Sequence, residues 1–461
     1  MVHRAPGIFS GHGFIKNGST RAALRVKPNM SGRPMRIFAS LLPAVCTIAA
    51  AQLTPVPPNP TETPSHPFFI TKTWVVGGVG DWDYLTMDPV ADQLLIAHGP
   101  TVQVVDVDSG TIAGTVKGLR QAHAIVLDHD GTHGYVTDGP ANVVRVFDRI
   151  SFEVVASIPT GPSPRSMALD PVSGLLFVVG APAVESGNQA PSRTSSSQQP
   201  IRANRPVPRS AAGHTASTIT VIDAQRRTPL AQILLPGALG FAETDGHGHI
   251  FITVADRNLI LRLDAQAIGN AAHRALDAHK EDTQPNPPGP DGKPALLDWS
   301  PGASPAPPAD AYPSTFRLDS SCQEPHALAF DAAHERLFAA CSNFKLVVLN
   351  AGTGQTAAVV PIGPGADAIA YDPNRGIIYS ANGGGDGSLT IIQQDVTDTY
   401  SVVETLPTRQ NARTIAVNPS DGSVYLVAVI SGATLNSPPV TGSNLTVRPI
   451  DASFQVLVVG N

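Results

Sequence analysis

The sequence predicts an all-β protein, a seven-bladed β-propeller built from four-stranded antiparallel blades. The main observation is a repeat marked by an Asp or Asn that ends an apolar strand. The gaps between successive markers are 40, 42, 75, 86, 41 and 46 residues, so four gaps span one repeat and two span one repeat plus an insertion. The seven markers are Asp88, Asp128, Asp170, Asp245, Asp331, Asp372 and Asn418.

Each repeat reads as a meander of short strands. A turn with Pro or Gly follows most markers and leads into an apolar second strand, as in DPVSGLLFVV and DPNRGIIYSA. Pro presets φ for such a turn, and Gly supplies its positive φ. The third strands are continuous β-branched runs such as TITVIDAQ, which are typical of strands buried on both faces. A sheet with two apolar faces must stack on copies of itself, as propeller blades do.

The ring is predicted to close through a strand that precedes the first repeat. The seventh repeat ends after three strands, at Gly460. Thr71 to Gly78 reads as a strand with no partner of its own. We therefore expect this strand to complete the last blade and to leave no full-length sheet edge open.

The N-terminal region, residues 1–51, is predicted to be an extension that contains a signal peptide. Met35-Arg36 precedes a short apolar run, Ile37 to Ala49, and small residues follow before Gln52. This order is typical of secretory signals, and the run is too short for a stable membrane anchor. We expect Met35 to be the true start, with a long basic leader as the alternative, and the mature protein to be periplasmic or secreted.

The remainder divides into a linker, a propeller and three insertions. Residues 52–70 are rich in Pro and Thr and are predicted to link to the propeller at 71–461. The insertion at 183–216 is rich in Ser, Pro, Gln and Arg and is expected to be disordered. The insertion at 266–313 begins with AIGNAAHRALDAHK, which is compatible with a short helix, and continues as a Pro-rich loop. The insertion at 431–449 is a smaller polar excursion.

Composition limits the partners and activities to be expected. The net charge is −6 and aromatic residues make up 5% of the chain, so neither the basic face nor the stacking platforms of a nucleic-acid binder are expected. No hydrophobic segment beyond the signal peptide is long enough to span a membrane, and we expect a monomer. The sequence contains no nucleophile elbow, Walker loop, His-Glu-x-x-His or haem motif, which favours a binding role over an enzymatic one.

Cleavage of the signal peptide would leave two cysteines, Cys322 and Cys341. In an exported protein such a pair favours a disulfide over a redox site. The first cysteine precedes the first strand of the fifth repeat and the second ends its second strand, which places both on one face. The predicted disulfide closes a loop of about 20 residues and contributes on the order of 3 kcal/mol in the chain-entropy description.

Repeat counting also predicts where functional side chains gather. The chain enters each first strand and leaves each second strand on one face, so positions five before and ten after each marker form a polar rim over the channel. The alternative is that these groups only pair with one another, as in structural ion-pair networks. The predicted ligand-binding residues of the rim are Asp83, His98, His123, Asp138, Arg165, His326, Asp367, Asn382 and Arg413.

We predict no cofactor, with a divalent metal as the alternative. His123 and His326 belong to the second and fifth repeats, nearly opposite each other in a ring of seven, so they are not expected to share an ion. His98 and His123 come from neighbouring repeats, and Asp83 offers a third ligand. Three such groups are the minimum for a protein-held metal.

The chain from about Thr71 to Asn461 resembles the YncE-like, YVTN-repeat β-propellers that bacteria export. The resemblance rests on YVTD at 135–138, YSAN at 379–382, CQEPH at 322–326, and the Gly-Pro turns and Val-Ile-Asp strand ends. It implies an exported binding or scaffold module that takes an unidentified protein or small-molecule ligand. The resemblance leaves two alternatives, a lactonase-like metal-dependent hydrolase and a single-stranded-DNA-binding propeller.

Overall fold

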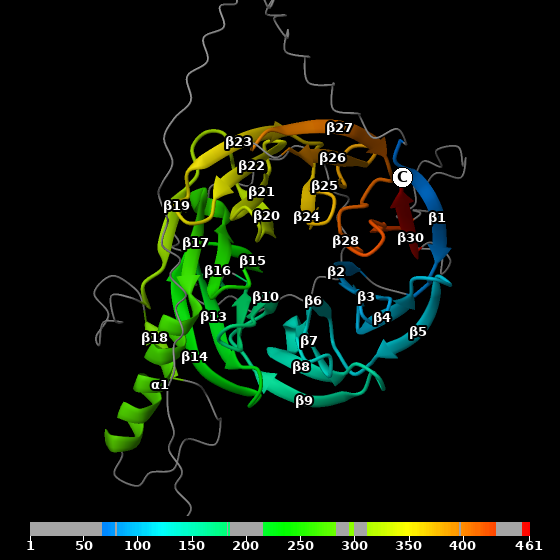
Figure 1. Ribbon diagram of the computed structural model, residues 1–461. Helices are drawn as coiled ribbons and strands as arrows, with labels where there is room; N and C mark the ends of the chain where they lie inside the picture. The colour runs from blue at the N-terminus through cyan, green and yellow to red at the C-terminus, as the bar shows by residue number, and fades with distance from the viewer. Residues whose placement is uncertain are drawn as a thin grey trace, which may run out of the picture. The chain divides into compact units, whose positions relative to one another are not determined.

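The computed structural model describes residues 67–78, 81–181, 183–184, 215–282, 295–298, 311–395, 398–429 and 454–461. Within these residues, seven antiparallel meanders stand in a ring around a common centre (Figure 1). The predicted seven-bladed β-propeller is therefore confirmed. The N-terminal extension, the signal peptide, most of the linker and the insertion at 431–449 lie outside the described residues, as does 185–214 of the first insertion.

The first two blades are plain four-stranded meanders, with the first strand nearest the centre and the fourth at the outside (Figure 1). Blade 1 consists of β2 (Trp82–Asp88), β3 (Gln93–His98), β4 (Thr101–Asp106) and β5 (Thr111–Val116). Blade 2 consists of β6 (Ala122–Leu127), β7 (His133–Asp138), β8 (Val143–Asp148) and β9 (Val154–Pro159), with the 3-10 turn η1 (Gly139–Ala141) between β7 and β8.

Blades 3 and 4 carry the first two insertions. Blade 3 consists of β10 (Pro164–Asp170), β11 (Leu175–Gly180), β13 (Thr215–Asp223) and β14 (Thr228–Pro236), and the short β12 (Ala183–Val184) also pairs with β13. Blade 4 consists of β15 (Leu239–Thr244), β16 (His249–Val254), β17 (Leu259–Asp264) and β19 (Ser314–Arg317), with the turn η2 (Ala255–Arg257) after β16.

Blades 5 and 6 are again plain meanders. Blade 5 consists of β20 (Pro325–Asp331), β21 (Arg336–Cys341), β22 (Lys345–Asn350) and β23 (Thr356–Pro361). Blade 6 consists of β24 (Ala366–Asp372), β25 (Ile377–Asn382), β26 (Ser388–Gln394) and β27 (Tyr400–Pro407). The four central residues of β22 are buried, as expected for a strand covered on both faces by neighbouring blades.

Blade 7 closes the ring with strands from both ends of the repeat region. It consists of β28 (Ile415–Val417), β29 (Val424–Val429), β30 (Phe454–Gly460) and β1 (Phe69–Val75). β1 pairs antiparallel with β30, with Phe69 opposite Gly460 and Val75 opposite Gln455. The predicted closure by the strand that precedes the first repeat is therefore confirmed (Figure 1).

The second insertion departs from the expected Pro-rich loop at one point. Its first part forms the helix α1 (Ala265–Asp282), where the sequence is compatible with a helix. Farther on, β18 (Ala295–Asp298) pairs in parallel with β14 and adds an outer strand to blade 3. The loop expectation fails here because β14 is an edge strand, whose unpaired backbone groups can bind any short extended segment.

The hydrophobic core lies between adjacent blades. One cluster joins Phe177 and Ile219 of blade 3 to Ile250 and Leu263 of blade 4, all buried. Another joins Leu94 of blade 1 to blade 7. Each interface removes the apolar faces of two sheets from water, so every blade depends on its neighbours.

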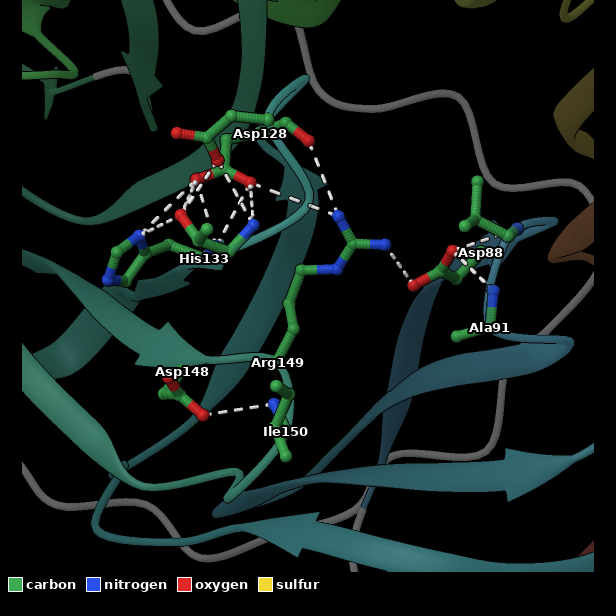
Figure 2. A network of polar contacts seen from close by, with 10 residues as sticks. Asp88, Ala91, Asp128, His133, Asp148, Arg149 and Ile150 are labelled. Carbon is green, nitrogen blue, oxygen red and sulfur yellow. Dashed lines mark hydrogen bonds and ion pairs between the residues drawn. The ribbon is translucent and has the colours of Figure 1, made fainter.

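Three of the Asp markers, Asp88, Asp170 and Asp331, link their turns to the next blade. Asp88 accepts backbone N–H bonds from Val90 and Ala91, both 3.1 Å long, and its other oxygen pairs with Arg149 of blade 2 (Figure 2). Arg149 also lies 3.9 Å from Asp128, the marker of its own blade.

Two later markers also bond the next blade. Asp170 accepts a hydrogen bond from Gly248 N–H at 3.0 Å, and Asp331 accepts one from Gln394 Nε2 at 2.7 Å. The marker therefore stabilises the stacking of blades as well as the turn.

Cys322 and Cys341 form the predicted disulfide in blade 5, with their Cα atoms 5.4 Å apart. Both side chains are buried. Among the described residues, no helix combines the length and the apolar character needed to cross a membrane.

Candidate functional site

The first strand of each of six blades contains a β-bulge near its start. A bulge inserts a residue into the strand and changes the direction of its side chain. In five of these blades the bulge contains a predicted rim residue, and the register shifts lie at Asp83, His123, Arg165, His326 and Asp367. Counting five residues back from the marker therefore finds the bulge in each of these five inner strands.

Five of the nine predicted residues line one cavity at the mouth of the channel. The cavity has a volume of about 490 Å³ and receives residues from β2, β10, β15, β20, β24 and the segment before β28. This volume is in the usual range for small-molecule sites. The predicted residues that line it are Asp83, Arg165, His326, Asp367 and Arg413.

His123 lies behind this lining, where it is buried and supports Asp83. Its Nδ1 lies 2.7 Å from Asp83 Oδ2. The pair joins blade 2 to blade 1 across their first strands. His123 therefore belongs to the rim as a partner of a lining residue.

Arg413 already has partners within the rim. Its Nε lies 3.1 Å from Asp367 Oδ2, and its guanidinium lies 5.7 Å from the centre of the Trp82 ring. Burial raises the pKa of Asp367 and the neighbouring Asp83 adds to this, while Arg413 opposes the shift. The positive charge of Arg413 is therefore matched by a carboxylate.

Arg165 differs from Arg413 in having no partner. Its side chain is exposed in the cavity and makes no hydrogen bond or ion pair with any residue of the described ranges. His326 on β20 lines the same cavity, with its Nε2 2.8 Å from Ser342 Oγ. The mouth therefore offers one arginine with all its donors unused.

The other three predicted residues do not line this cavity, so the structure does not bring all nine together. His98 is buried against Phe454, with ring centroids 3.9 Å apart, and its Nδ1 lies 2.7 Å from Gln103 Oε1. Asp138 is buried and accepts the backbone N–H groups of Arg120 and Gln121, at 3.0 and 3.1 Å.

Asn382, the third of these residues, bonds Ser388 and Thr390 through its amide nitrogen. All three end second strands, one position farther from the centre than the first strands. Their side chains therefore face neighbouring strands and blades.

The predicted metal ligands do not converge either. Asp83 and His123 pair with each other, whereas His98 packs in blade 1 against blade 7. Among the described residues, the group of potential ligands that does converge is Asp128, Asp130 and His133, between the end of β6 and the start of β7. Figure 2 shows Asp128 and His133 side by side. Asp128 there accepts the backbone N–H groups of Thr132 and His133 and lies near Arg149, so donors within the protein already satisfy it.

Repeat counting missed the floor of the cavity. Tyr84 of blade 1 and Phe241 of blade 4 meet across the channel, with ring centroids 5.3 Å apart and planes at 19°. Glu243, also on β15, lines the cavity beside them. The available signal was a departure from the repeat, because these positions carry small or apolar residues in most other blades.

A second cavity opens on the opposite side of this floor. Its volume is about 780 Å³, and Tyr84, Leu85, Phe241 and Glu243 line both cavities. Val90 and Ile150 flank it, each 88% exposed. The aromatic pair and Glu243 therefore form a neck between a polar mouth and a more apolar chamber.

The fold and this site define a β-propeller with a polar, partly charged channel mouth. No protein-family model matches the chain, and no curated protein sequence matches it. Among solved structures it is similar to a chain from the "Crystal Structure of Mitotic Checkpoint Complex", with a TM-score of 0.54 and 14% identity over 83% of this chain and 96% of that chain. A likeness at this identity shows the shared propeller fold alone.

Proposed function

We propose that this chain is an exported propeller that serves as a binding module, and that its channel mouth takes an anionic group of the ligand on Arg165. The observation that carries the proposal is the unpaired, exposed Arg165 in a cavity of about 490 Å³ whose other arginine is already neutralised. A guanidinium presents five N–H donors in a planar fork that matches a carboxylate or a phosphate.

The architecture supports a binding role. Propeller folds are commonly binding or scaffold modules, and the solved propeller that this chain resembles was described within a protein complex. The ligand group can belong to a small molecule or to an acidic residue of a protein, because both present the same anion to the mouth.

Export and membership of the YVTN-repeat family belong to the same proposal. The Cys322–Cys341 disulfide supports an oxidising compartment, where such bonds persist. The signal-peptide pattern before the repeats agrees with this location.

The test is binding of simple anions to the mature protein. We expect acetate, succinate or inorganic phosphate to bind by calorimetry, and the Arg165→Gln protein to bind the same anion about 10- to 100-fold more weakly, the value of a charge-assisted hydrogen bond. Arg317→Gln is the matched control, because Arg317 is exposed on the outer strand β19. Equal binding by the Arg165→Gln and wild-type proteins, or no anion binding at all, would refute the proposal.

The two alternatives have less support. The hydrolase hypothesis needs a group of metal ligands. The predicted ligands Asp83, His98 and His123 do not converge among the described residues. The DNA hypothesis needs a basic face with several stacking surfaces, whereas the net charge is −6 and aromatic residues make up 5% of the chain.

A further inference from the structure

The neck between the two cavities contains a carboxylate without a counter-ion. Glu243 accepts one hydrogen bond, from the backbone N–H of Thr244 at 3.1 Å. Within the described ranges it makes no ion pair with any Lys, Arg or His. Burial raises the pKa of Glu243 to about 7, and the Thr244 N–H opposes part of that shift. A cation that enters the neck would therefore supply the interaction that the protein does not.

The surroundings of Glu243 favour an organic ammonium over a metal ion. The stacked rings of Tyr84 and Phe241 line the same neck, and aromatic faces attract ammonium groups. Calcium needs six to eight oxygen ligands and magnesium a near-octahedral set, which one carboxylate cannot provide. Among the described residues Glu243 is not part of any group of three potential metal ligands.

The neck and the mouth belong to one cavity. Arg165 on β10 and Glu243 on β15 come from adjacent blades and line the same space of about 490 Å³. One ligand can therefore meet an unpaired cation and an unpaired carboxylate at the same time. The required ligand carries the opposite charges at its two ends.

We infer that the channel binds a zwitterionic small molecule, with its carboxylate on Arg165 and its ammonium on Glu243 beside Tyr84 and Phe241. The carboxylate half of this inference rests on the proposed function, whereas the ammonium half stands on the neck alone. Compounds of the amino-acid and short-peptide class have this charge arrangement and fit the cavity volume.

Other titratable groups share the space with Glu243 and must be separated from it in a pH test. The groups that line the mouth are Asp83, Tyr84, Arg165, His326, Asp367 and Arg413. The groups that line the second cavity, on the other side of the neck, are Asp88, Asp128, His129, Asp130 and Arg149. The two histidines remain in a Glu243→Gln protein, so a pH dependence that this substitution removes belongs to Glu243.

The test measures the binding of three kinds of probe to the mature protein by calorimetry. Butylammonium tests the neck, butyrate tests the mouth, and a series of ω-amino acids of increasing length tests both together. We expect Glu243→Gln to weaken butylammonium binding about tenfold or more and to leave butyrate binding unchanged, with Arg165→Gln giving the reverse. The best-fitting ω-amino acid should bind at least about tenfold tighter than either single probe, because its second contact is intramolecular.

The controls separate the two halves of the inference. Glu153→Gln, an exposed carboxylate of blade 2, should bind all probes as the wild type does. Phe241→Leu keeps an apolar side chain and should weaken butylammonium binding several-fold. Wild-type binding of butylammonium should strengthen as pH rises through about 7, where Glu243 ionises, and Glu243→Gln should lose this dependence.

The possible outcomes distinguish failure of the ammonium site, of the anion site and of the shared ligand. Butylammonium binding that is absent, or equal in the wild-type and Glu243→Gln proteins, overturns the ammonium site while leaving the anion site standing. Butylammonium binding without Arg165-dependent butyrate binding overturns the zwitterion and the proposed function together, and leaves a cation site. Independent binding of both probes with no gain for any ω-amino acid overturns the shared ligand.

Discussion

Replacing Trp74 with Ala should open the ring at its closing strand. Trp74 on β1 is 9% exposed and stacks on Tyr425 of β29, with ring centroids 5.7 Å apart. Gly110 provides the space for the indole, since a Cβ at that position would collide with it. Truncation of a buried aromatic side chain to Ala costs about 3–5 kcal/mol. We expect a loss of that size in the free energy of unfolding, measured by urea denaturation and circular dichroism.

The matched control is Phe69→Ala on the same strand, because Phe69 is 52% exposed. We expect this change to cost less than about 1 kcal/mol. Hydrogen exchange provides a second measurement: amides of β30 should lose protection in Trp74→Ala, because β1 pairs with that strand. Equal costs for the two variants, with β30 protected equally in both, would refute closure of the ring by β1.

Three further predictions concern stability. Reduction of the Cys322–Cys341 disulfide, 19 residues apart in sequence, should lower the free energy of unfolding by about 3 kcal/mol in urea titrations. Arg149→Met should cost about 3–5 kcal/mol, because it leaves the buried Asp88 carboxylate without its ion pair. Arg226→Met should cost less than about 1 kcal/mol, because the Arg226 side chain is 72% exposed and Asp223 still accepts the backbone N–H of residue 226. Glu243→Gln should match the wild-type stability near pH 4 and exceed it by about 1–2 kcal/mol at pH 8, measured by urea titration at each pH.

The sign of the last effect follows from the raised pKa. The folded protein holds the Glu243 proton more tightly than the unfolded chain does. Ionisation between the ordinary glutamate pKa of 4.5 and the raised pKa of about 7 therefore disfavours the folded state. Glutamine does not ionise, so the Glu243→Gln protein does not lose stability in this pH range. A stability difference that stays constant from pH 4 to pH 8 would contradict the raised pKa of Glu243. Equal losses for the two arginine variants would contradict the role of the marker network.

The sequence predicted the ring because its evidence repeats, but it does not specify which of the predicted rim residues share one cavity. Each repeat contains a marker, a turn and a buried strand, so seven copies specify seven blades. Counting along the chain does not reveal radial position, which is why His98, Asp138 and Asn382 were placed on the rim although they bond within and between blades. β18 was missed for a different reason. A four-residue strand has no periodicity to detect, and its pairing depends on the open edge of β14.

The floor of the channel could have been found by asking where the repeat fails. Side chains at one level of a propeller share one axis, so only a few of the seven can be large. Four residues before the marker, the seven residues are Tyr84, Ala124, Ser166, Phe241, Ala327, Ala368 and Thr414. Two residues before it, they are Thr86, Val126, Ala168, Glu243, Ala329, Ala370 and Ala416.

The two aromatic residues in these sets meet across the channel, and the single acidic residue lines the neck beside them. Residues that recur at the same position of most repeats have a structural role, as the markers Asp88, Asp170 and Asp331 do when they bond the next blade. A channel-facing residue that differs from the residues at the same position of the other blades is not explained by a structural role that all blades share. In this propeller the departures line the neck of the candidate site, where equivalent positions of the blades face a common space.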